Sequence, residues 1–141
     1  EIAQCLVGSE MCIRDRSRLT GIPVEDLRED RIQILKKFAD GYQVTCVLKD
    51  SRTLIADKAN EICLNLTGNS AMAKAGSGDV LAGVIAGFMV QEKDTKKAAR
   101  LGTYVHGLAG DLAKFEKGVY SVMARDLIEY ISKALMKLED E

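Results

Sequence analysis

The sequence is poor in the residues on which several kinds of chemistry depend. His106 is the only histidine among the 141 residues, so a reaction that needs two imidazoles is excluded. The four cysteines, Cys5, Cys12, Cys46 and Cys63, are spaced too widely for paired zinc ligands. We therefore expect Cys46 and Cys63 to be small buried hydrophobic residues, with no metal site built from the protein's own side chains. Acid and base roles must fall mainly to carboxylates.

Long apolar runs and an excess of one charge are also missing. The longest apolar run, residues 80–90, is well short of the roughly 20 residues that cross a bilayer, and no secretory signal is recognisable. The formal net charge is only −1. Lys93, Lys96 and Lys97 form a small cluster without interleaved aromatic residues, which is typical of a solvated face. We expect a cytoplasmic protein that binds neither nucleic acid nor a membrane.

The N-terminal segment differs in origin from the rest of the chain, in our interpretation. LVGSEMCIRDR, residues 6–16, matches the translation of one reading frame of a transposase library adapter. We therefore leave residues 1–16 out of the expected fold as a sequencing artefact and assign 17–141 to one domain. The alternative is a natural N-terminal segment. Reading the genomic locus tests this interpretation, because an intact gene should lack these codons and continue upstream through a further half domain.

The first half of the remaining chain has an α/β pattern. Pro23 and the acidic residues after it predict a helix over residues 24–40, with Gly41 as its stop. Nearly continuous apolar and β-branched residues predict a buried strand over 44–48 that feeds a small antiparallel meander. The other strands of the meander are expected at 54–56 and 61–66.

The second half is predicted to be helical after a glycine-rich loop over 67–78. A helix over 79–91 is apolar nearly all round, so we expect it to be buried. A helix over 95–115 repeats apolar residues at spacings of three and four, at Ala98, Leu101, Val105, Leu108 and Leu112. A last helix, capped by Ser121, is expected to pack through Leu127, Ile131 and Leu135.

The run Ala75-Gly76-Ser77-Gly78-Asp79 is a glycine-rich turn that leads directly into a helix. Backbone N–H groups at a helix start are unsatisfied, and glycines let the backbone approach phosphate oxygens closely. We predict an anion site at Gly76, Ser77 and Gly78, with Asp79 placed to act as general base on a nearby hydroxyl. On this spacing alone, a simple turn with Asp79 as helix cap stays open as an alternative.

The longer run around this turn, NLTGNSAMAKAGSGDVLAG at residues 65–83, resembles the signature of the ADP- or ATP-dependent (S)-NAD(P)H-hydrate dehydratases. Further matches to the family occur in order at residues 19–21, 47–49, 105–111 and 124–128. The resemblance covers nearly everything from Arg18 to Leu135. It implies a ribokinase-like three-layer α/β/α fold, of which this chain would be a C-terminal fragment.

The resemblance also implies a hydro-lyase that repairs damaged nicotinamide cofactors. In this family a nucleotide phosphorylates the hydroxyl of the hydrated nicotinamide ring, and loss of phosphate restores NADH or NADPH. The implied ligands are ADP or ATP, Mg²⁺ and the hydrated NADH or NADPH. A homo-oligomer is expected for the full-length protein. We expect little or no activity from these 141 residues alone, because a complete family domain is about twice this length.

The family's site residues carry over at few positions. Gly78 is similar to a residue that contacts the AMP moiety, and Asp79 to the one that meets the substrate and activates its hydroxyl. A five-residue turn would line the nucleotide, formed by Lys49, Asp50, Ser51, Arg52 and Thr53. A supporting loop would contain Asn65, Thr67, Gly68 and Asn69.

Two features depart from the family pattern. Lys49-Asp50 stands where Lys-Gly is common and adds a negative charge near a phosphate-bearing ligand, and Ala71 replaces the usual glycine before Met72. A ribokinase-like small-molecule kinase and a non-catalytic nucleotide-binding module stay open as alternatives, although the Asn-x-Thr-Gly-Asn run favours the dehydratase. His106, on a mostly apolar helix, is expected to be structural.

Overall fold

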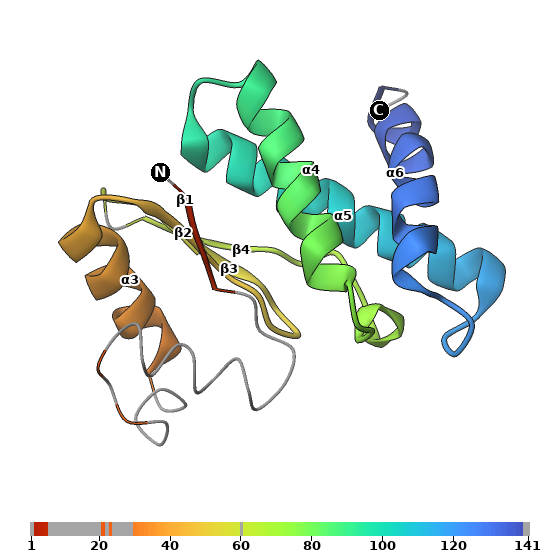
Figure 1. Ribbon diagram of the computed structural model, residues 1–141, viewed down its shortest axis with the longest axis horizontal. Coiled ribbons are helices and arrows are strands. Elements are labelled where there is room, and N and C mark those ends of the chain that lie inside the picture. The colour runs from red at the N-terminus through yellow and green to blue at the C-terminus, as the bar shows by residue number, and fades with distance from the viewer. Residues whose placement is uncertain (1, 6–20, 22, 24–29, 60, 140–141) are drawn as a thin grey trace. The chain divides into compact units, whose positions relative to one another are not determined.

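The chain divides into two compact units, Glu1–Leu64 and Asn65–Glu141. The computed structural model describes residues 2–5, 21, 23, 30–59 and 61–139, and Figure 1 labels their helices and strands. The first unit contains a small sheet and a helix, and the second contains three long helices. Within the described ranges, no helix is both long enough and apolar enough to span a membrane.

The first unit is built on a four-stranded sheet with the order β1-β2-β3-β4. Its strands are β1 (Ile2–Cys5), β2 (Thr45–Leu48), β3 (Leu54–Ala56) and β4 (Ile62–Leu64). β2, β3 and β4 pair antiparallel in sequence order, which confirms the predicted meander, although β4 is shorter than predicted. Every residue of β2 and β3 is buried, as their continuous apolar sequences predict.

Strand β1 pairs parallel with β2, with Ile2 opposite Thr45. Parallel strands need a crossover connection, and the helix α3 (Arg31–Tyr42) lies between the two in the chain. Our expected fold did not include β1, because residues 1–16 were set aside as an artefact. The adapter-like residues 6–16 lie outside the described part, so the interpretation of their origin stays a prediction.

Helix α3 starts and ends later than predicted. Asp30, expected inside the helix, is its N-cap and accepts a hydrogen bond from the N–H of Gln33 at 3.1 Å. The helix passes through Gly41 and ends at Tyr42, because Gln43 takes the left-handed conformation in place of a glycine. The Gln43 side chain donates to the carbonyl of Asp40 at 2.7 Å, which satisfies a terminal carbonyl. The remaining predicted residues, 24–29, lie outside the described part.

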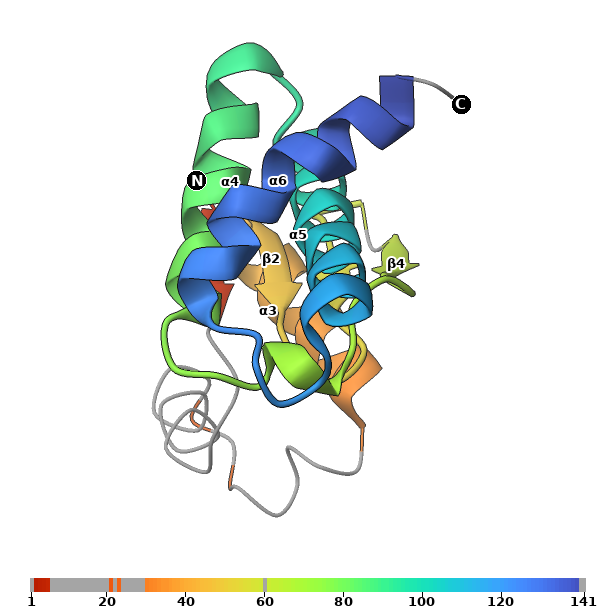
Figure 2. The ribbon, with the colours of Figure 1, turned by 90° about the vertical axis from the view of Figure 1, so that its right-hand side faces the viewer.

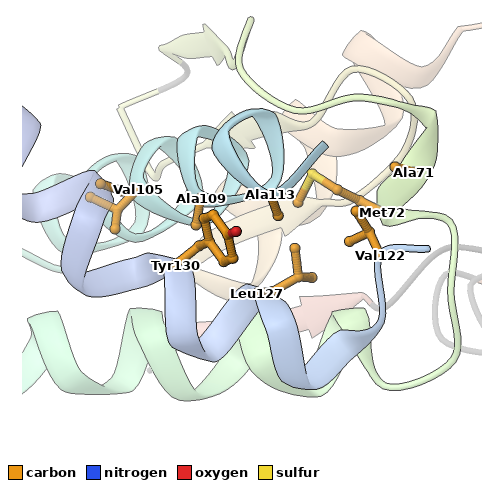
Figure 3. Close-up of a cluster of buried hydrophobic side chains, with 9 residues drawn as sticks. Ala71, Met72, Val105, Ala109, Ala113, Val122, Leu127 and Tyr130 are labelled. Carbon is orange, nitrogen blue, oxygen red and sulfur yellow. The ribbon is translucent and has the colours of Figure 1, made fainter. Parts of the chain in front are cut away.

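The second unit consists of α4 (Ser77–Gln91), α5 (Thr95–Lys117) and α6 (Ala124–Glu139), preceded by the short 3₁₀ helix η1 (Ser70–Met72). The three long helices pack on one another (Figure 2). Ala109 and Ala113 of α5 lie opposite Tyr130 and Leu127 of α6 in the buried cluster between them (Figure 3). This core holds the loop between residues 65 and 76 in place beside α5.

The buried faces of α4 and α5 differ from those predicted. In α4 only Ser77, Leu81 and Ile85 are buried, and Val90 is 88% exposed, so the expectation of a fully buried helix is wrong. The buried face of α5 contains the expected Ala98 and Val105, but its other members are mostly small residues, and the expected leucines are only partly buried. A Cβ added to Gly102 would lie 2.7 Å from the Ile85 side chain. Close approach of the two helices therefore excludes large side chains from this face.

Helix α6 is not capped by Ser121, because it begins three residues later, at Ala124. Instead, the Asp126 carboxylate accepts a hydrogen bond from the N–H of Met123 at 2.8 Å and pairs with the Lys117 ammonium. A carboxylate in the first turn can satisfy an N-terminal donor as a capping serine would. Asp126 thus joins the end of α5 to the start of α6.

Asp126 gives this joint a pH dependence. The Lys117 ammonium, and then the Met123 N–H, hold the pKa of the Asp126 carboxyl below its ordinary value. Because the pKa of this carboxyl is lower in the folded state than in the unfolded chain, where it is about 3.9, its ionised form stabilises the fold at a pH above about 3.9. This stabilisation is lost as the pH falls through the folded-state pKa. We expect Asp126→Asn to destabilise the protein at pH 7, with the difference from wild type shrinking below about pH 4. Urea unfolding at several pH values checks this, and a difference independent of pH would contradict it.

Candidate functional site

The N-terminus of α4 carries two backbone donors that no part of the described protein uses. Gly76 is the N-cap, with φ +85° in the left-handed region that favours glycine. The N–H of Ser77 donates to Lys74 O at 3.2 Å, whereas those of Gly78 and Asp79 donate to no described residue. Two free N–H groups at the positive end of a 15-residue helix can bind an anion.

Ser77 adds a third polar group to this helix end. The residue is 1% exposed, and its hydroxyl is the single buried side-chain polar atom without a partner among the residues that the structure describes. A buried hydroxyl without a hydrogen bond costs about 1–3 kcal/mol. A phosphate oxygen can accept hydrogen bonds from the two N–H groups, so this helix end fits a phosphate-bearing ligand.

Asp79 is the third residue of α4, and its exposed carboxylate forms no hydrogen bond or ion pair with the rest of the described chain. The cap position belongs to Gly76, so no hydrogen bond supports the alternative in which Asp79 serves as the helix cap. A carboxylate without a protein partner, next to an anion site, can accept a proton from a hydroxyl held in line with the phosphate.

All four residues of the supporting loop are fastened to α5. The Asn65 side-chain amide donates to Thr103 O at 3.4 Å. The Thr67 hydroxyl donates to Tyr104 O at 3.0 Å. The Asp111 carboxylate accepts hydrogen bonds from the N–H of Gly68 at 2.9 Å and from the side-chain amide of Asn69 at 2.7 Å. These contacts hold the loop that leads to the anion site. Asp111 was not among the predicted site residues, although it lies in the family-like run at 105–111.

Asn65 and Asn69 complete the loop through bonds within it. The Asn65 side-chain amide donates to Thr67 O at 3.1 Å, and its carbonyl oxygen accepts from the Thr67 hydroxyl at 3.1 Å. Asn69 caps η1 by accepting from the N–H of Ala71 at 2.9 Å. Both amides therefore support the backbone of the loop.

Two glycines of α5 let the loop lie directly on the helix. A Cβ on Gly107 would be 2.1 Å from the Thr67 hydroxyl and 2.7 Å from Thr67 backbone carbon, and a Cβ on Gly110 would be 2.1 Å from the Met72 sulfur. At Gly107 a larger side chain would displace the backbone of the loop, whereas at Gly110 it would displace the end of the Met72 side chain. Side-chain volume on α5 therefore controls the position of the residues before the anion site.

We expect Gly107→Ala to lower the free energy of unfolding by about 1–3 kcal/mol, because the new methyl group overlaps the Thr67 backbone. Alanine normally stabilises a helix relative to glycine by up to about 1 kcal/mol. Gly83→Ala in α4 is the matched control, since a Cβ there meets nothing within 4 Å, and it should be neutral or stabilising. Urea unfolding of both variants checks this; equal stabilisation by both would contradict the close contact.

The five-residue turn predicted to line the nucleotide joins β2 to β3, since Leu48 pairs with Leu54 across it. It belongs to the first unit, whereas the other predicted site residues belong to the second. Lys49 is half-buried, Ser51 and Arg52 are exposed, and Thr53 is buried. The Asp50 carboxylate pairs with the Arg31 guanidinium and accepts from the N–H of Ser51 at 2.7 Å. The extra negative charge of Asp50 is thus paired with a cation of the same unit.

The described residues contain no group of three or more histidine, cysteine or acidic side chains that could hold a metal ion. Magnesium usually keeps several waters and binds through one or two carboxylates and the phosphates of a substrate. At the α4 terminus, Asp79 is an acidic residue of the first turn whose carboxylate could contact an Mg²⁺ ion bound to nucleotide phosphates.

The chain is similar to curated proteins whose names refer to NAD(P)H hydrate. The bifunctional NAD(P)H-hydrate repair enzyme Nnr of Moorella thermoacetica is 42% identical over 127 residues, which are 90% of this chain and 24% of the relative. The ADP-dependent (S)-NAD(P)H-hydrate dehydratase of Bacillus subtilis is 34% identical over 122 residues, 86% of this chain and 44% of the relative. The chain thus spans less than half the length of these curated relatives.

Solved structures confirm the expected ribokinase-like α/β fold, present here in part. The ADP/ATP-dependent NAD(P)H-hydrate dehydratase from Bacillus subtilis, co-crystallised with ATP/Mg²⁺ and soaked with CoA, has a TM-score of 0.84 at 30% identity. The match covers 96% of this chain and 47% of that one. A ribokinase-like superfamily protein from Enterococcus faecalis has a TM-score of 0.66 at 29% identity, covering 94% and 43% of the two chains.

The family model described as NAD(P)H-hydrate dehydratase matches residues 13–133. This range contains the five-residue turn, the supporting loop and the N-terminus of α4, so the features that suggested the resemblance all lie inside the match. On this evidence the chain belongs to the NAD(P)H-hydrate dehydratase family.

Proposed function

We propose that the full-length protein dehydrates (S)-NAD(P)H hydrate to NAD(P)H at the expense of ADP or ATP. The observation that carries this proposal is the pair of free N–H groups on Gly78 and Asp79 beside an unpartnered carboxylate, in a chain of this family. An anion site and a proton acceptor at one helix end are the two parts that phosphorylation of a hydroxyl requires.

In the proposed reaction the N–H groups of Gly78 and Asp79 bind phosphate oxygens of the nucleotide, so that its terminal phosphate lies in line with the substrate hydroxyl. The hydroxyl oxygen of the hydrated ring attacks that phosphorus, Asp79 accepts the hydroxyl proton, and AMP or ADP leaves. The carbon–oxygen bond of the phosphorylated ring then breaks, phosphate departs with the electron pair, and loss of a proton from the adjacent carbon restores the double bond. Positioning and charge stabilisation supply most of the catalysis in such phosphoryl transfers.

The proposed ligands follow the relatives. One is named as ADP-dependent, and a solved structure at TM-score 0.84 was co-crystallised with ATP and Mg²⁺. We propose that Lys49, Arg52 and the neighbouring turn residues line the nucleotide, and that Mg²⁺ is carried by its phosphates. Pairing of Asp50 with Arg31 reduces the repulsion that an unpaired carboxylate at this turn would exert on a phosphate.

The test is recovery of NADH from its hydrate by the purified full-length protein with ADP or ATP and Mg²⁺. We expect one phosphate and one AMP or ADP to form for each NADH regained, because the hydroxyl leaves as phosphate. Nucleotide binding without NADH recovery would instead support the non-catalytic binding module. Nucleotide consumption with a stable phosphorylated product and no phosphate release would support a small-molecule kinase.

A further inference from the structure

His106 lies in the middle of α5 with 3% of its surface exposed, and its Nε2 is 3.0 Å from the backbone oxygen of Ser77 in the first turn of α4. A carbonyl oxygen can only accept a hydrogen bond, so Nε2 must carry the proton. The buried side of the anion site is therefore in direct contact with a histidine that does not reach its open N–H groups.

The hydrogen bond from His106 is the second one that the Ser77 carbonyl can accept. The carbonyl lies inside α4, where the N–H four residues later is the regular helical donor, so the His106 bond is an addition to the helix pattern. An imidazole whose role was only to fill the core would not need to donate to a backbone carbonyl that already has its helical partner. The position of this bond, on the first carbonyl of the helix, therefore points to an effect on the helix terminus.

The Ser77 carbonyl and the Gly78 N–H belong to one peptide group, and that N–H is one of the two open donors. A hydrogen bond accepted by the oxygen polarises the peptide and makes its N–H a stronger donor, because hydrogen bonds in a chain reinforce one another. The bond also fixes the tilt of the peptide plane. Both effects act on the bound anion through Gly78.

We propose that His106 is a positioning residue for the nucleotide phosphate: its Nε2–H holds and polarises the Ser77–Gly78 peptide so that the Gly78 N–H points at the anion. This assignment rests on the proposed function for the identity of the ligand. In this proposal His106 acts on the nucleotide only through the Ser77–Gly78 peptide. Its removal should therefore weaken phosphate binding while the side chains at the mouth of the site are unchanged.

The test compares His106→Leu with His106→Gln in the full-length protein. Leucine removes the donor at similar volume, whereas the glutamine amide can place an N–H near the position of Nε2. We expect His106→Leu to weaken ADP and ATP binding by about fivefold to tenfold, and His106→Gln to restore most of the affinity. In protein without nucleotide, the Gly78 amide proton resonance should move upfield in the leucine variant and stay near its wild-type position in the glutamine variant.

Thr103→Val is the matched control, because Thr103 is buried in the same helix and its hydroxyl bonds to Ala99 O within α5. It should reduce stability without moving the Gly78 resonance. Equal nucleotide affinity in wild type and both His106 variants, or equal losses in leucine and glutamine, would overturn the role of His106. Wild-type protein that binds nucleotide but regenerates no NADH would count against the proposed function alone.

Discussion

Asp79→Asn is expected to lower the turnover number of the full-length protein by about 10² to 10⁴-fold while nucleotide affinity changes little. General-base assistance typically contributes a factor of this size. Asparagine has the same shape but cannot take up the proton of the substrate hydroxyl. Because Asp79 makes no hydrogen bond or ion pair with the described protein, the substitution removes no structural contact that could account for a large effect.

The measurement follows NADH recovery from its hydrate with saturating ADP or ATP, together with nucleotide binding by calorimetry. Asp94→Asn is the matched control, since Asp94 also lies at a helix N-terminus and caps α5 through the N–H groups of Lys96 and Lys97. Asparagine caps helices as well as aspartate does, so this variant should keep wild-type turnover. Near-normal turnover of Asp79→Asn would remove Asp79 from the mechanism.

Gly78→Val should weaken ADP or ATP binding by well over tenfold, which corresponds to more than about 1.4 kcal/mol. Gly78 is the second residue of α4, and its N–H is one of the two open donors. A branched side chain at this position would stand where the phosphate oxygens must approach the backbone. Gly78 does not have a positive φ, so a side chain there should not strain the backbone. We therefore expect the substitution to reduce nucleotide affinity and not to destabilise the fold through strain.

Gly83→Val separates this steric effect from the general effect on α4 of replacing a glycine with valine. Gly83 lies in the same helix, is exposed, and has nothing within 4 Å of an added Cβ. Valine has a somewhat higher helix propensity than glycine, so neither variant should lose stability through propensity, and only Gly78→Val should lose affinity. Calorimetry that finds unchanged affinity for Gly78→Val would exclude Gly78 from the nucleotide site.

Structural elements that depend on residues close together in the sequence could be predicted. The strands β2 and β3 follow from continuous apolar residues, and α5 from its apolar repeat. Helix ends were less predictable, because competing caps lie close together in the chain. Asp30 caps α3 where Pro23 was expected to start it, and Asp126 replaces Ser121 at α6. A side-chain bond to the backbone decided the boundary in both cases.

The buried faces could be predicted only in part, because they depend on how closely helices approach. The apolar repeat of α5 identifies Ala98 and Val105, which are buried, but it does not identify the glycines that the structure buries against other segments, Gly102, Gly107 and Gly110. Within the site, the run from Gly76 to Asp79 was recognisable as a local motif. The contact of His106 with Ser77, 29 residues away, and those of Asp111 with the loop, more than 40 residues away, exist only in the folded chain.

The attachment of the supporting loop to α5 affects the cooperativity of unfolding. By composition, the glycine and asparagine residues at 65–69 would form a segment that opens locally at little cost. The bonds from Thr67, Gly68 and Asn69 to α5 instead tie this segment to the most buried helix of its unit. Local opening must then break the same contacts as separation from α5, so the anion site and the helical unit should be lost in one transition. A variant that destabilises the packing of α5 would weaken nucleotide binding without altering any residue that meets the nucleotide.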